Sequence, residues 1–141
     1  MAIDNIFGIA GSALNSQTVR MNAIASNLAN AGTVSGSEQD AFRAKRVVFK
    51  AIMDQQVAPQ DSSYKGGVKV ELMKNDPTPV RRQLDPGNPS ADKDGYIFTS
   101  NVNEMAEMVD MMAASRSYQN NVEVINTARQ LMMRTLDITK A

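Results

Sequence analysis

The sequence predicts a mainly α-helical protein with a small β-containing middle region, whose N- and C-terminal helices pack as an α-helical coiled coil. Three observations support this fold class. Apolar residues recur at alternating steps of four and three through residues 1–32. Residues 101–141 contain no glycine and no proline. All 5 prolines of the chain fall between these two segments. We therefore expect an N-terminal helix over 1–32, a loop and β-rich region over 33–100, and a long C-terminal helix over 101–141.

The first helix carries a heptad-like apolar seam with one polar interruption, at Gln17. The seam residues are Ile3, Phe7, Ala10, Leu14, Gln17, Met21, Ile24, Leu28 and Ala31. Gly8 and Gly11 lie inside this helix, and each costs about 1 kcal/mol of helix stability relative to alanine. Such a helix needs a partner. The partner is either the second helix of the same chain or a helix of a neighbouring subunit, and the pattern leaves both open.

The middle region reads as loops, turns and two short strands. The alternation of Val68-Lys69-Val70-Glu71-Leu72 predicts a strand, and residues 95–98 predict a second one that leads into the long helix. Residues 33–41 and 60–67 read as loops, while 42–57 mixes basic and apolar residues. The sequence Asp85-Pro86-Gly87-Asn88-Pro89 predicts a turn.

The second helix is expected to begin near Asn101, where Asn101 and Glu104 imitate a capping box. A helix of this length spans roughly 55 Å at about 1.5 Å per residue. Its apolar stripe is broad, so it needs packing partners along its length. The stripe comprises Val102, Met105, Met108, Val109, Met112, Ala113, Tyr118, Val122, Val124, Ile125, Ala128, Leu131, Met132, Leu136 and Ile138. Its methionines either fill a core or form a surface that adapts to non-identical neighbours.

Composition argues against an enzyme. The chain has no cysteine and no histidine, which removes Cys–His nucleophiles, Ser–His–Asp triads and most zinc sites. No cofactor and no metal are expected: Asp92-x-Asp94-Gly95 resembles part of a calcium loop but lacks both anchoring carboxylates, so it reads as a turn. Arg43, Lys45 and Arg46 form either a solvated face or a phosphate site. The formal net charge is zero, so nothing favours nucleic acid, and no stretch is apolar enough for membrane insertion.

Several words of the sequence resemble the signatures of the flagellar basal-body rod and hook proteins. Ala25-Ser26-Asn27-Leu28-Ala29-Asn30-Ala31 is similar to the N-terminal signature of that family, and Ala114-Ser115-Arg116-Ser117-Tyr118-Gln119 to its C-terminal signature. The later run through Asn126 and the Asp-Pro-Gly turn look like the branch that forms the proximal rod. The positions that match the family motif are Ser26, Asn27, Leu28, Ala29, Asn30, Asp85, Pro86, Gly87, Ser115, Arg116, Tyr118 and Asn126.

The resemblance implies a structural subunit that polymerises through its terminal helices into the hollow drive shaft that transmits torque. Its implied partners are further copies of itself, other rod subunits, the export gate at the base of the basal body, and transiently the flagellar export apparatus. Its implied place is the periplasm-spanning rod, reached without a cleaved signal peptide. The apolar side chains expected to form packing and assembly surfaces are Ile3, Phe7, Leu14, Met21, Ile24, Leu28, Met105, Met108, Met112, Tyr118, Val122, Ile125, Leu131, Met132 and Leu136.

Two other readings stay open without the resemblance. One is a coiled-coil adaptor that docks a single partner and never polymerises. The other is a helix-rich chaperone for exported subunits. An adaptor stays a defined small oligomer as its concentration rises, and a chaperone holds an export substrate without being exported.

Overall fold

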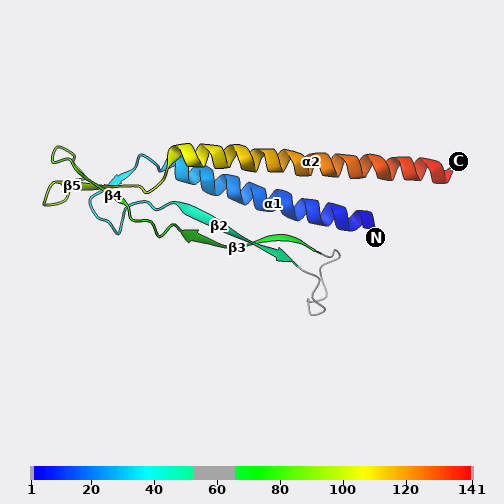
Figure 1. The fold of residues 1–141 in the computed structure, drawn as a ribbon, viewed down its shortest axis with the longest axis horizontal. Coiled ribbons are helices and arrows are strands. Elements are labelled where there is room, and N and C mark those ends of the chain that lie inside the picture. Colours follow the sequence, from blue (N-terminus) through cyan, green and yellow to red (C-terminus); the bar gives the residue numbers. More distant parts are fainter. Residues whose placement is uncertain (1, 53–65, 141) are drawn as a thin grey trace. The chain divides into compact units, whose positions relative to one another are not determined.

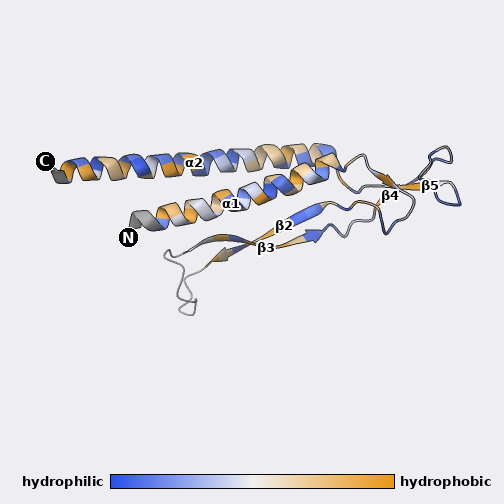
Figure 2. Cartoon of the chain, turned by 180° about the vertical axis from the view of Figure 1, so that it is seen from behind, coloured by the Kyte–Doolittle hydropathy of each residue, from blue (hydrophilic) through white to orange (hydrophobic). Residues whose placement is uncertain are grey.

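The computed structural model describes residues 2–52 and 66–140, with a long helix at each end of this part of the chain (Figure 1). In order, its elements are α1 (Ala2–Ala29), β1 (Val34–Ser35), β2 (Lys45–Ile52), β3 (Gly67–Asn75), β4 (Arg81–Leu84), β5 (Tyr96–Thr99) and α2 (Glu104–Lys140). The prediction of two long helices around a small β-containing region is confirmed. Both helices carry hydrophobic and hydrophilic residues along their whole length, as amphipathic packing requires (Figure 2).

The chain forms two compact units, each built from pieces of both helices. The first comprises Met1–Arg20, Val48–Leu72 and Ala113–Ala141, and the second comprises Met21–Val47 and Met73–Met112. The expected division into residues 1–32, 33–100 and 101–141 follows the sequence order of the elements, whereas the compact units cut across that order. This happens because each long helix contributes one stretch to each unit.

The second unit holds a three-stranded sheet with β5 at its centre. β5 pairs antiparallel with β1 on one side and β4 on the other, so Thr99 lies opposite both Val34 and Arg81. The buried apolar side chains of this unit are mostly small or branched: Ala23, Ile24, Ala41, Ala44, Val80, Ile97 and Val102. A core of this size buries little apolar area, which suits a chain with few aromatic residues.

In the first unit, two serines of α1 hold the start of β3. Ser12 Oγ accepts a hydrogen bond from the Val68 N–H at 3.1 Å, and Ser16 Oγ donates to the Val68 carbonyl at 3.3 Å. Serines four residues apart lie on one helix face, so both can reach the same strand residue. The buried apolar residues of this unit are alanines: Ala10, Ala114 and Ala128. Strands β2 and β3 pair in a two-stranded sheet.

The start of α2 differs from the sequence-based expectation. The helix begins at Glu104, and Asn103 is its N-cap: Oδ1 of Asn103 accepts a hydrogen bond from the Ala106 N–H at 3.2 Å. Asn101, the expected cap, instead binds the loop before β2 and the turn before β4. Its Oδ1 accepts from the Ala44 N–H at 2.7 Å and its Nδ2 donates to the Thr78 carbonyl at 2.8 Å.

Both predicted strands are present, the first longer than expected and the second displaced by one residue. The expected strand 68–72 lies within β3, and the expected strand 95–98 corresponds to β5. Part of the mixed segment 42–57 forms β2, and the expected loop 33–41 contains β1. The expected loop 60–67 lies outside the described residues, except for its last two. Within the described part of the chain, no helix is long and apolar enough to cross a membrane.

Candidate assembly surfaces

The first turns of α2 expose an apolar patch. Met105, Met108, Val109 and Met112 recur at helical spacing, and their exposed fractions run from 49% to 72%. These are large side chains, and the patch is contiguous along one face of the helix. A contiguous exposed apolar patch of large side chains on a folded protein marks an interaction site. The sequence-predicted residues Met105, Met108 and Met112 therefore lie where another molecule can reach them.

The opposite face of α2 is withdrawn from solvent. Glu107, Ala114 and Ala128 are buried there, and Tyr118 and Ile125 are half-buried. Their spacing of seven, four, seven and three residues keeps them on one side of the helix. Of the other expected α2 residues, Val122 and Met132 are half-buried, and Leu131 and Leu136 are exposed. The expected single stripe on α2 thus divides into an inner and an outer face.

The expected seam of α1 is covered within the chain. Ile24 is buried, and the remaining seam residues that the structure describes are buried or half-buried: Phe7, Ala10, Leu14, Gln17, Met21, Leu28 and Ala31. The side chain of Ile3 lies outside the described residues. Oε1 of Gln17 is buried and has no hydrogen-bond partner among the described residues, which fits its position as a polar interruption in an apolar seam.

The largest fully buried side chains of the described residues are polar. Glu107, Asn27 and Ser16 are the largest fully buried side chains, with Glu107 and Asn27 at 0% exposure. Burying a carboxylate is costly unless it is paired and hydrogen-bonded. The contacts of Glu107 therefore decide how the second unit is held together.

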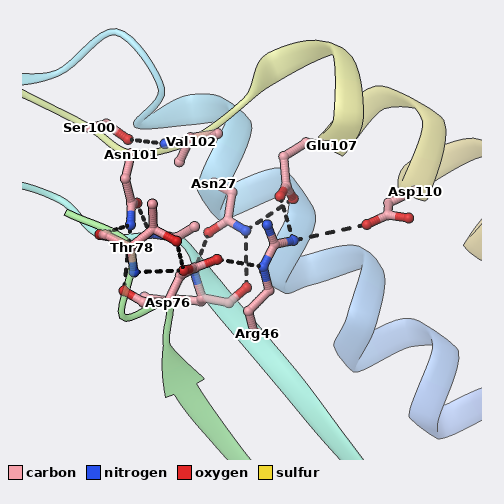
Figure 3. A network of polar contacts seen from close by, with 11 residues as sticks. Asn27, Arg46, Asp76, Thr78, Ser100, Asn101, Val102, Glu107 and Asp110 are labelled. Carbon is pink, nitrogen blue, oxygen red and sulfur yellow. Dashed lines mark hydrogen bonds and ion pairs between the residues drawn. The ribbon is translucent and has the colours of Figure 1, made fainter. Parts of the chain in front are cut away.

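Glu107 is paired on both of its oxygens (Figure 3). Nη1 of Arg46 lies 2.8 Å from Oε1, and Nδ2 of Asn27 donates to Oε2 at 3.0 Å. The same amide of Asn27 donates to the Lys45 carbonyl at 3.0 Å, while its Oδ1 accepts from the Lys45 N–H at 2.7 Å. Asn27 thus continues β2 as a strand partner would, and simultaneously binds α2. We call Asn27, Arg46, Asp76 and Glu107 the polar node.

Asp76 completes the polar node. Its Oδ2 accepts from Nε of Arg46 at 3.2 Å, and its Oδ1 accepts from the Thr78 hydroxyl at 2.6 Å and the Thr78 N–H at 2.9 Å. The hydrogen bonds from Thr78, with help from Arg46, hold the pKa of Asp76 below its ordinary value. Partial burial works to lower the pKa of Arg46, but the hydrogen bond to Asp76 and the charge of Glu107 outweigh it and raise that pKa.

The node resolves the open question about the basic residues 43–46. Arg46 pairs with Glu107 and Asp76, and its Nη1 also lies 3.9 Å from Asp110. Arg43 pairs with Glu38 at 3.4 Å. The ammonium of Lys45 lies 5.9 Å from the ring centroid of Phe42. All three side chains make contacts within the second unit. For Arg46, the two expected roles, a solvated face or a phosphate site, are therefore replaced by a structural role.

Two further groups of motif positions, at the end of α1 and in the turn at residues 85–87, make backbone contacts. Asn30 donates from Nδ2 to the Ser26 carbonyl at 2.8 Å, close to the end of α1. The Asp85-Pro86-Gly87 sequence forms the expected turn: the Asn88 N–H binds the Asp85 carbonyl at 3.2 Å, and the Asp85 N–H binds the Gly95 carbonyl at 3.0 Å. The expected turn at Asp92 is also present, because Oδ1 of Asp92 accepts from two backbone N–H groups, of Asp94 and Tyr96.

Three motif positions on α2 differ in exposure. Ser115 is half-buried, whereas Arg116 and Asn126 are exposed.

In the first unit, α1 and α2 line an apolar groove of about 420 Å³, bordered by Ile6 on one helix and by Val124, Ala128 and Leu131 on the other. Among the described residues, no group of three or more acidic, histidine or cysteine side chains could hold a metal ion.

Comparison with known proteins identifies the family of the chain. Residues 7–35 match the family model described as flagella basal body rod protein, and residues 93–138 match the one described as flagellar basal body rod FlgEFG protein C-terminal. Three relatives share the name flagellar basal-body rod protein FlgC. They are 49% (Yersinia enterocolitica), 48% (Escherichia coli O157:H7) and 47% (Salmonella typhi) identical, over 98% of this chain and 98% of each relative. The chain therefore belongs to the flagellar basal-body rod protein family, in its FlgC branch, and is a structural protein of the rod and not an enzyme.

Proposed function

We propose that the chain polymerises into the rod through its terminal helices, and that these helices pack as a coiled coil within and between subunits. The observation that supports this most is the exposed patch of Met105, Met108, Val109 and Met112. The inner face of α2 is already covered, so this patch remains for a neighbour. Methionine side chains repack easily, and a patch rich in them tolerates neighbours that are not identical.

The partners in this proposal are further copies of the chain, other rod subunits and the export gate at the base of the basal body. We also propose that the subunit reaches the periplasm-spanning rod through the flagellar export apparatus, without a cleaved signal peptide. A core rich in alanine and polar contacts supports that route, because a small apolar core makes unfolding before export inexpensive.

We further propose that residues 1–32 and 101–141 serve as the assembly segments and that residues 33–100 brace them. The polar node supports the bracing role, since it joins Arg46 and Asp76 of the middle region to α1 and α2. A rod that transmits torque loads its subunit contacts in shear. Ion pairs and hydrogen bonds between helices and strands resist that load because they are directional.

The test is a double substitution in the exposed patch, Met105→Asp with Met112→Asp. Both positions face solvent, so the folded monomer should keep its helix content, with a stability change within about 0.5 kcal/mol. In a strain that lacks its own copy of the gene, this variant should fail to restore swimming, and isolated basal bodies should lack the rod. The matched control is Gln119→Asp with Gln130→Asp, which adds the same charges at exposed polar positions of the same helix. Normal swimming by the variant with Met105→Asp and Met112→Asp would contradict the proposal.

Substitutions on the inner faces test the same idea less cleanly. Leu28 and Ile125 are half-buried, so an aspartate at either position also disturbs packing within the chain. Loss of swimming in Leu28→Asp or Ile125→Asp is expected, and circular dichroism of the purified variants separates loss of folding from loss of assembly.

A further inference from the structure

The first unit contains a second groove, between α1 and the strands β2 and β3. Its volume is about 600 Å³, and it is open to solvent on one side. Apolar side chains supply much of the lining, from Phe7 and Val19 on α1 and from Ile52, Val68 and Val70 on the strands. The serine contacts to Val68 fix the strand against the helix, so the groove is held open by hydrogen bonds.

Gly11 lies in the wall of this groove, and within the described part of the chain no close contact requires a glycine at this position. A Cβ built on Gly11 would meet no atom within 4 Å, and the residue is exposed. Glycine inside a helix costs about 1 kcal/mol relative to alanine. The missing side chain therefore leaves room for an atom from another molecule, which can approach the helix backbone closely at this point.

The groove also carries a positive charge that has no ion-pair partner among the described residues. Lys69 lies on its rim and is exposed. The neighbouring charges on these strands are already used, because Lys50 and Glu71 pair with each other at 3.2 Å. Within the described ranges 2–52 and 66–140, no carboxylate lies within ion-pair distance of Lys69. An occupant with an apolar face and one carboxylate would complement this groove.

The exposed patch of α2 has that chemistry. Met105, Met108, Val109 and Met112 form its apolar face, and Glu104 lies beside Met108, four residues before it. Glu104 is exposed, and it forms no ion pair with a lysine or arginine side chain among the described residues. One chain thus carries both an apolar groove with a lysine and an apolar helix face with a glutamate, and neither charge has an ion-pair partner within residues 2–52 and 66–140.

We propose that the groove of one copy receives the first turns of α2 from a second copy of this chain. Glu104 of the second copy pairs with Lys69, and the methionine side chains fill the space above Gly11. The contact joins two different surfaces, so it is heterologous and leaves a free groove and a free patch at its two ends, as an open polymer requires. This inference rests on the proposed function and names the surfaces that meet.

Disulfide trapping tests the contact directly, because the chain has no cysteine of its own. Asn15 lines the groove and is exposed, so Asn15→Cys should cross-link to Met108→Cys when the two purified full-length variants are mixed under mild oxidation. The expected rate is at least about tenfold above that of Asn15→Cys mixed with Lys93→Cys, an exposed position on the turn before β5. Equal rates in the two mixtures would overturn the proposal.

A charge exchange separates this contact from association in general. Lys69→Glu in the copy that carries Asn15→Cys, or Glu104→Lys in the copy that carries Met108→Cys, should lower the cross-linking rate about tenfold. Mixing the two charge variants should restore the rate, because the contact again joins a negative and a positive side chain. No restoration overturns the proposal. Gly11→Leu should keep the fold and abolish the cross-link, whereas an unchanged cross-link overturns it. If these variants still build rods in cells, the proposed function stands and only this pair of surfaces is wrong.

Discussion

Nη1 of Arg46 lies 2.8 Å from Oε1 of Glu107, and this ion pair joins β2 to α2 across 61 residues of sequence. The two partners differ in environment: the Glu107 side chain is fully buried, while that of Arg46 is 45% exposed. Because Arg46 also binds Asp76, it keeps a partner when Glu107 is removed. The reverse does not hold, since Glu107 without Arg46 is a buried carboxylate whose one remaining hydrogen bond among the described side chains comes from the amide of Asn27.

Arg46→Ala should therefore destabilise the chain more than Glu107→Ala does. We expect losses of roughly 3 kcal/mol and roughly 2 kcal/mol in the free energy of unfolding, respectively, measured by urea denaturation at pH 7. The double variant should lose less than the sum, because the loss in Arg46→Ala includes the cost of a buried, unpaired Glu107, and that cost disappears when Glu107 is removed as well. Additive losses would show that the two groups do not interact. Lys50→Ala, which breaks an exposed pair with Glu71, is the control and should lose less than about 1 kcal/mol.

Asn27→Asp should be worse than Asn27→Ala. The amide both donates to Glu107 and accepts from the Lys45 N–H, a combination that a carboxylate cannot reproduce. An aspartate at this position also places a second carboxylate against Glu107. We expect a loss of about 2–3 kcal/mol for alanine and a larger one for aspartate, by thermal or urea unfolding. Asn22→Asp, at an exposed position of the same helix, should change stability by no more than about 0.5 kcal/mol.

The polar node should make stability depend on acid pH through Asp76. Hydrogen bonds from Thr78 hold the pKa of Asp76 in the folded chain below its ordinary value of 3.8. The folded state then binds this proton less readily than the unfolded state. The stabilisation is present above pH 3.8 and is lost as the pH falls through the lowered pKa.

Replacing Asp76 by asparagine should remove that contribution. Urea midpoints from pH 7 to pH 3 should show a gap between wild type and Asp76→Asn that narrows as the pH falls below about 4. Thr78→Val removes the hydroxyl donor, so the pKa of Asp76 should lie closer to its ordinary value. The free energy of unfolding of this variant should therefore depend less on pH than that of the wild type. A gap of constant size over the whole range would mean that Asp76 titrates alike in both states.

Sequence periodicity was sufficient for the helices because each long element repeats one simple pattern. Residues such as Phe7, Leu14 and Ile24 recur at helical spacing, and the seam they form is covered in the structure. In the middle region, the sequence predicted structure only where neighbouring residues alone determine the local conformation. Asp85-Pro86-Gly87 forms its turn, and the alternation around Val68 forms a strand.

The polar node could not be predicted from spacing. Asn27, Arg46, Asp76 and Glu107 are distant in sequence, and each alone resembles an ordinary surface residue. Motif resemblance marked Asn27, but its partners depend on how β2 and α2 approach it. A weak signal was available at Glu107, which lies seven residues before Ala114 and so falls on the same face of α2 as Ala114 and Ala128.

The cap of α2 gives a prediction that separates two neighbouring asparagines. Asn103→Ala removes the acceptor for the Ala106 N–H and should cost about 1 kcal/mol, mostly as fraying of the first turns. Asn101→Ala removes hydrogen bonds to Ala44 and Thr78 and should cost more, about 2–3 kcal/mol. Hydrogen exchange distinguishes them: Asn103→Ala should speed exchange near residue 106, and Asn101→Ala near residue 44. A helix that frays only in Asn101→Ala would restore the sequence-based assignment of the cap.

Gly95 should not tolerate a side chain. Its φ is +78°, a left-handed conformation that disfavours residues with a Cβ, and a Cβ there would lie 3.2 Å from Cγ and 3.3 Å from Cβ of Pro86. The clash would separate the Asp85-Pro86-Gly87 turn from the start of β5. We expect Gly95→Ala to lower the free energy of unfolding by about 1–3 kcal/mol. Gly32→Ala is the matched control, because a Cβ there meets nothing within 4 Å and its φ is not positive. Equal stability of the two variants in urea denaturation would show that neither the backbone conformation at Gly95 nor its contact with Pro86 contributes to the fold.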